Sequence, residues 1–187
     1  MKILITGFDV FKGLDINPSY EAIKCLPKII DNKEIIVMKL PVVFDECYKE
    51  LEKVIKKEKP DYVINIGVAT SRNEISIESS AKNIKKSNIK DNSGNIFLNE
   101  SKIINNADEI LKTSIDINKI LLELKGYKIP SYISNDAGSY VCNNVYFYSL
   151  YNEKQYGYKA LFIHVPGINS MDIQMMNKAI KIIIRTL

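Results

Sequence analysis

Short apolar runs rich in β-branched residues alternate along the chain with longer segments whose apolar positions recur at helical spacing. The short runs predict strands at residues 2–6, 34–40, 61–67, 131–134 and 159–165. The longer segments predict helices, one that opens at Asn17-Pro18-Ser19 and others at residues 44–57, 116–124, 139–151 and 171–185.

Strands that alternate with helices indicate a mostly parallel sheet with both faces covered. Residues 75–78 depart from this pattern, because polar and apolar residues alternate at period two and predict a short exposed strand. Residues 83–99 are rich in Asn, Lys and Ser and predict a long loop with a hairpin. Since the chain carries no repeat or linker, we predict a single α/β domain over residues 1–187. We expect a three-layer α/β/α architecture with a small exposed hairpin.

Composition narrows the class of protein. The 187 residues are 46% hydrophobic and 26% charged, as in an ordinary folded domain. The net charge of +4 is spread along the chain, which argues against a nucleic-acid partner.

The first residues lack the features of a secretion signal and no apolar stretch approaches the roughly 18 to 20 residues that span a bilayer, so we expect a cytoplasmic protein without a membrane partner. Cys25, Cys47 and Cys142 are widely spaced, which suits neither disulfides nor zinc, and we expect no metal or cofactor.

Two segments place reactive residues at the carboxyl ends of predicted strands, where α/β sheets bind ligands. His164, the single histidine, precedes a turn at Pro166-Gly167, although a satisfied core histidine is an equally simple interpretation. Cys142 follows a turn of small residues and lies near the start of a helix, whose N–H groups lower a thiol pKa and stabilise an oxyanion. Cys25 and Cys47 lie on apolar helix faces and fit small buried hydrophobes.

A cysteine nucleophile with a histidine base usually has a third polar group that orients the imidazole. Glu78 is one candidate, and by spacing alone Glu74 and Asp136 are others. Pattern alone therefore indicates a cysteine hydrolase and leaves the third group open.

A series of motifs, in order along nearly the whole chain, resembles the pyroglutamyl peptidase type I (pyrrolidone-carboxylate peptidase) family. These are TGF-x-x-F at 6–11 with NPS at 17–19, LPVxF at 40–44, R-x-x-I-x-x-E at 72–78 with Ala81 and Asn83, D-N-x-G at 91–94, SxxAGxYxCN at 134–143 and HVP at 164–166. Each motif is weak alone, but their number, order and spacing make the resemblance specific.

The resemblance implies a cytosolic cysteine exopeptidase that removes an N-terminal pyroglutamyl residue from peptides through an acyl-enzyme, without a metal. It implies a triad in which Cys142 is the nucleophile, His164 the base and Glu78 the group that orients His164. The residues that it implies for binding the lactam ring are Phe8, Phe11, Ile89 and Val141, with Asn17 and Asn88 as further candidates.

The chain also departs from the family pattern. Asn88 stands where the family has an arginine implicated in oxyanion stabilisation, Lys12-Gly13 replaces a Gly-Gly pair, and Ser79 replaces an arginine. Lys85, Lys86 and Lys90 are candidates to replace the missing charge. The resemblance implies a homo-oligomer (dimer or tetramer), but residues 84–115, where the family carries loop and assembly contacts, match poorly, so dimer, tetramer and monomer all stay open. Two alternatives stay open: a Cys-His-Glu hydrolase with altered N-terminal specificity, and a weakly active homologue that binds blocked peptides.

Overall fold

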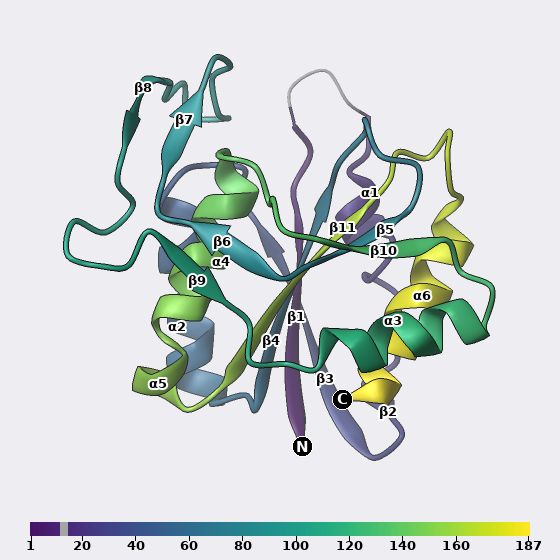
Figure 1. The fold of residues 1–187 in the computed structure, drawn as a ribbon. Coiled ribbons are helices and arrows are strands. Elements are labelled where there is room, and N and C mark those ends of the chain that lie inside the picture. Colours follow the sequence, from purple (N-terminus) through teal and green to yellow (C-terminus); the bar gives the residue numbers. More distant parts are fainter. Residues whose placement is uncertain (12–14) are drawn as a thin grey trace.

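A seven-stranded sheet forms the centre of the computed structural model, which describes residues 1–11 and 15–187. The strand order is β10-β5-β11-β4-β1-β3-β2 (Figure 1). Four neighbouring strands are parallel: β3 (Lys33–Leu40), β1 (Lys2–Phe8), β4 (Tyr62–Val68) and β11 (Lys159–Val165). β2 (Ile29–Ile30) pairs antiparallel with β3, while β5 (Ile75–Glu78) and β10 (Ser131–Ser134) are parallel to each other and antiparallel to β11. The predicted mostly parallel sheet is confirmed.

Helices cover both faces of the sheet and complete the predicted three layers of a single-domain α/β fold. On one face lie α1 (Pro18–Glu21), α3 (Ile117–Gly126) and α6 (Ile173–Thr186). On the other lie α2 (Glu46–Glu58), α4 (Val141–Tyr151) and α5 (Glu153–Tyr156), at the left of Figure 1. No helix in the described ranges is long and apolar enough to cross a membrane.

The apolar runs of β1, β4 and β11 are nearly continuous because these strands are buried on both sides. In β1, Ile3 and Ile5 pack into the core beneath α1 and α6, whereas Leu4 packs into the core beneath α2 and α4. A side chain caps the starts of α1, α3 and α6: Asp172, for example, accepts a hydrogen bond of 2.7 Å from the Met175 N–H at the start of α6.

The prediction of an exposed strand at residues 75–78 is wrong. β5 lies inside the sheet between β10 and β11, and all four of its residues are buried. Its period-two pattern reflects polar residues, Ser76 and Glu78, that are themselves buried. In sequence, a half-exposed strand and a buried strand that carries polar functional groups show the same alternation of polar and apolar residues.

The middle of the chain forms two small antiparallel pairs beside the main sheet. β7 (Lys85–Ser87) and β8 (Phe97–Ser101) form the predicted hairpin, with Leu98 66% exposed. β6 (Ser80–Lys82) and β9 (Ile110–Lys112) form a pair that the sequence pattern did not predict.

Candidate active site

Glu78 and His164 meet inside the sheet, on the neighbouring strands β5 and β11. Oε1 of the buried Glu78 carboxylate lies 2.7 Å from Nδ1 of His164. Because a carboxylate only accepts hydrogen bonds, Nδ1 carries the proton and Nε2 is left to accept one. Of the three acidic candidates, Glu78 therefore contacts the imidazole, whereas Glu74 is exposed and the Asp136 carboxylate binds Lys82 and the Gly138 N–H.

Cys142 lies in the first turn of α4, as predicted. It lies beside β4, the strand that pairs with β11, which carries His164. Gly67 of β4 is in register with His164, and a Cβ on Gly67 would lie only 2.9 Å from Sγ of Cys142. The sulfur therefore packs against the bare Cα of Gly67. Within the described residues no hydrogen bond joins the thiol to the imidazole, and such contacts are often loose before substrate binds.

Burial dominates the electrostatics of these groups. It raises the pKa of Cys142 to about 12, together with the charge of Glu78, against opposing effects of Arg72 and of the residue's own N–H. The expected lowering by the helix start is thus outweighed, because neighbouring atoms desolvate the thiol although the residue keeps partial exposure.

The two partners of the thiol also shift. Burial lowers the pKa of His164 despite its contact with Glu78. Burial acts to raise the pKa of Glu78, but the hydrogen bond and charge of His164, with a contribution from Arg72, leave that pKa lowered. At neutral pH the site holds a thiol, a neutral imidazole and a carboxylate, which suits general-base activation of the thiol.

A cavity of about 390 Å³ opens beside Cys142 and has mostly apolar walls. Five of the residues that the resemblance implied for ring binding line it: Phe8, Phe11, Asn17, Ile89 and Val141. Sequence reasoning did not single out four further lining residues, Val42, Val68, Thr70 and Tyr140. Val42 and Tyr140 lie within matched motifs, which was the available signal.

Asn17 caps α1, as expected, and also lines the cavity. Its side chain accepts from the Ser19 N–H at 3.1 Å and so caps α1, and its Nδ2 donates to the Asp9 carbonyl at 2.8 Å. The second contact holds the strand end that carries Phe8 and leads to Phe11. The cap and the pocket assignments of Asn17 are therefore compatible.

The D-N-x-G motif anchors the chain next to Ile89, which lines the cavity. The buried Asp91 carboxylate accepts hydrogen bonds from the Phe44, Ser93 and Asn95 N–H groups at 2.9 to 3.0 Å. The Asn92 side chain donates to the Val10 carbonyl at 2.8 Å. These bonds tie the segment after Ile89 to the loop that follows β1.

Among the described residues that depart from the family pattern, Asn88 and Ser79 do not line this cavity. Asn88 is exposed and does not line it. Lys85 pairs with Asp45 and Lys86 with Glu100, and Lys90 is exposed and also outside the lining. None of the three lysines supplies charge inside the cavity. Ser79 donates its backbone N–H to the Ser134 carbonyl.

Two other sequence observations concern Lys12-Gly13 and the remaining cysteines. The Lys12-Gly13 departure lies outside the described residues. Cys47 is buried in α2 as expected, but Cys25 is exposed, because α1 ends at Glu21 and Cys25 lies in the turn after it.

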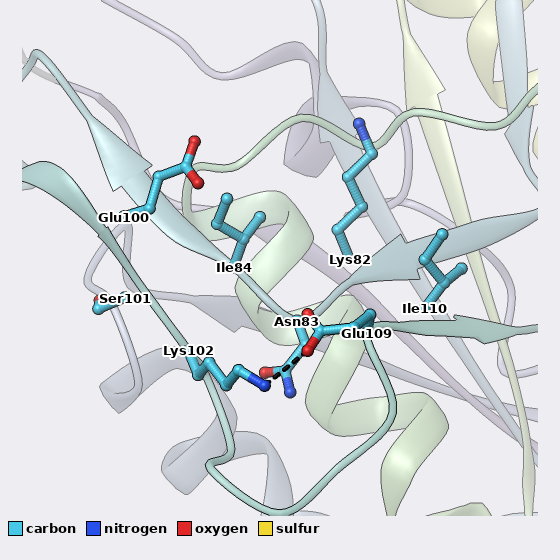
Figure 2. Close-up of a pocket in the computed structure, with 8 residues that line it drawn as sticks. All are labelled: Lys82, Asn83, Ile84, Glu100, Ser101, Lys102, Glu109 and Ile110. Atoms are coloured by element: carbon cyan, nitrogen blue, oxygen red, sulfur yellow. Dashed lines mark hydrogen bonds and ion pairs between the residues drawn. The ribbon is translucent and has the colours of Figure 1, made fainter.

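A second depression of about 400 Å³ lies between β6, β9 and the β7–β8 hairpin (Figure 2). An ion pair between Lys102 and Glu109 crosses it. Asn83 at its floor accepts from the Ile103 and Ile104 N–H groups at 2.9 Å. These two hydrogen bonds give a structural reason for the asparagine in the Ala81–Asn83 part of the motif. The depression shares no lining residue with the cavity at Cys142.

The arrangement has close counterparts. The chain is 42% identical to the pyrrolidone-carboxylate peptidase of Thermosipho melanesiensis over 179 residues, 95% of this chain and 88% of that protein. It is 41% identical to the protein of that name from Brachyspira hyodysenteriae, covering 100% and 98% of the two chains. A mutant pyrrolidone carboxyl peptidase from Pyrococcus furiosus superposes with a TM-score of 0.94 at 36% identity, covering 100% of this chain and 97% of that one. The profile of the pyroglutamyl peptidase family matches residues 1–185, and the chain belongs to that family.

Proposed function

We propose that this protein is a cysteine exopeptidase that hydrolyses the bond after an N-terminal pyroglutamyl residue. The observation that carries the proposal is the 2.7 Å contact between Glu78 and His164 beside a cysteine that opens into an apolar cavity. The membership of the family, whose relatives are named pyrrolidone-carboxylate peptidases, supports the same substrate.

The cavity suits a small neutral lactam ring. Phe8, Phe11, Ile89 and Val141 supply apolar walls, and backbone groups can bind the two polar edges of the ring. The ring carries no charged amine, so an N-terminal residue with a free ammonium group would pay a desolvation cost that the pyroglutamyl group does not.

The reaction steps follow from the protonation states that Cys142, His164 and Glu78 have before the reaction. Nε2 of His164 takes the thiol proton as Sγ of Cys142 attacks the carbonyl carbon of the pyroglutamyl residue. His164 then returns the proton to the leaving amine, and water hydrolyses the thioester. Glu78 stays ionised and stabilises the imidazolium that forms between these steps.

We assign stabilisation of the oxyanion to the first-turn N–H groups of α4, including that of Cys142. The first N–H groups of a helix lack intrahelical partners and face the partial positive end of its dipole. Asn88 is exposed and outside the cavity lining, so it is given no role in the chemistry. A cytoplasmic location and a homo-oligomeric state stay predictions.

The test is the release of fluorophore from a pyroglutamyl-coumarin amide by the reduced, purified protein. Cys142→Ala is expected to abolish turnover, and Cys25→Ala, a matched change at an exposed thiol, is expected to leave it unchanged. No turnover by folded wild-type protein would refute the proposal. Turnover of other blocked aminoacyl amides in preference would indicate altered specificity, and peptide binding without turnover would indicate a binding protein.

A further inference from the structure

Arg72 occupies a central position that the proposed mechanism does not use. It lies in the turn after β4, where its N–H binds the Ala69 carbonyl at 3.0 Å. Its Nη1 contacts Oε1 of Glu78, and its Nη2 donates to the Asp136 carbonyl at 2.7 Å. The side chain is 21% exposed, and Arg72 does not line the cavity beside Cys142.

The Glu78 carboxylate depends on Arg72 for its orientation. Oε1 receives both the Arg72 guanidinium and Nδ1 of His164, whereas the buried Oε2 has no hydrogen-bond partner in the described part of the chain. Without Arg72, the buried carboxylate would lose its one guanidinium partner and keep the imidazole, with the Ser134 hydroxyl as a neutral neighbour. A buried charge with so few partners is free to rotate away from His164 or to take up a proton.

The second contact of Arg72 reaches the segment before the nucleophile. Asp136 lies between β10 and α4, in the loop that leads to Cys142. Its carboxylate accepts from the Gly138 N–H at 3.0 Å, which folds this loop into a turn. One planar guanidinium thus joins the group that orients the base to the loop that carries the thiol.

The charge of Arg72 also balances the site. When the thiol proton moves to His164, the site holds the thiolate of Cys142, the imidazolium and the carboxylate of Glu78, with a net charge of about −1. The guanidinium beside Glu78 brings the sum to zero. A neutral buried cluster is less costly to desolvate than a charged one.

From these contacts we propose that Arg72 is a positioning residue of the reaction. It holds Glu78 on His164, clamps the loop before Cys142 and supplies the counter-charge for the thiolate. The inference rests on the proposed function for its turnover test but not for its thiol test, which needs no pyroglutamyl substrate.

The experiment compares Arg72→Met and Arg72→Lys with Arg185→Met, a change at the other arginine, which is exposed and pairs with Asp31. On the pyroglutamyl-coumarin amide, Arg72→Met is expected to lower kcat by about 10- to 100-fold, the effect of a hydrogen bond to a charged group. KM is expected to stay within about twofold because Arg72 does not line the cavity. Arg185→Met is expected to match the wild type.

The thiol test measures the rate of Cys142 alkylation by iodoacetamide against pH in a Cys25→Ala background. Arg72→Met is expected to slow alkylation near neutral pH by about tenfold, whereas Arg72→Lys keeps the charge and the wild-type alkylation profile. Arg72→Lys is still expected to lower kcat, since an ammonium cannot span both acceptors.

Several results would overturn the assignment: an unchanged kcat in either variant, a loss confined to KM, or an Arg72→Met alkylation profile that superimposes on the wild type. If Arg72→Met does not fold, Arg72→Lys decides by kcat alone. If the wild type lacks turnover, the proposed function fails, and the alkylation profiles still decide the role of Arg72.

Discussion

Gly67→Ala tests whether the position of the Cys142 sulfur controls the reaction. The added Cβ would lie 2.9 Å from Sγ of Cys142 and 2.7 Å from Cζ of Phe162. Neither neighbour can yield easily, because Phe162 is fully buried and packs against the His164 ring at a centroid distance of 4.7 Å. The methyl group therefore pushes on the nucleophile and on a side chain that supports the base.

The structure sets the size of the effect. Restoring an ordinary contact distance requires the sulfur to retreat by roughly 0.6 to 1 Å. A displacement of that size at a reacting atom costs on the order of 100-fold in kcat. Overpacking of the core is expected to cost about 2 kcal/mol of unfolding free energy, or about 4 to 8 °C in Tm. KM is expected to change little, because Gly67 does not line the cavity.

Steady-state kinetics and thermal unfolding separate the two effects. Gly126→Ala is the matched control, since a Cβ there meets nothing within 4 Å at the end of α3. It is expected to keep full activity and to gain up to about 1 kcal/mol of stability. A Gly67→Ala protein that is folded at the assay temperature and keeps kcat within about threefold of the wild type would refute the role assigned to the sulfur position.

Two further changes test the groups around the nucleophile. Between about pH 7.5 and 5.5 the free energy of unfolding should fall, because burial lowers the pKa of His164 and the unfolded chain then binds more protons; the slope is at most about 1.4 kcal/mol per pH unit. Urea unfolding of His164→Gln, which removes the single histidine, should show a flatter profile, and an equally steep one would contradict the assignment. Asp91→Asn should cost about 3 kcal/mol and raise KM, because an amide NH₂ would face N–H donors and loosen the loop after Ile89. A stability change below about 0.5 kcal/mol would show that this anchor is dispensable.

The sheet could be predicted because its signals are local. Continuous apolar runs ending in glycine or proline gave the four parallel strands to within about two residues. β6 and β9 could not be predicted, since three-residue strands separated by a long polar segment leave no periodic pattern. The turn containing Cys25 was missed for a related reason: the apolar face suggested a helix longer than the four residues of α1.

Prediction of the candidate site from the sequence required information of two kinds. His164 and Cys142 could be found from their places at strand and helix ends, and the resemblance selected Glu78 among three acidic residues. The thiol pKa could not be predicted, because desolvation depends on neighbours such as Gly67 that are distant in sequence. Nor could the contact of Arg72 with the Asp136 carbonyl, which joins loops 64 residues apart.

Asn88, unlike Ser79, departs from the family pattern in a part of the molecule that is separate from the residues contacting the reacting groups. Glu78, His164 and Gly67 lie on adjacent strands of one sheet, and their separations follow from strand register. Asn88 and the divergent segment around it lie on the exposed hairpin side of the fold. Sequence change on that side can alter the rim of the cavity through Ile89 without moving the sheet residues. Such changes should therefore appear in KM and in substrate preference before they appear in kcat.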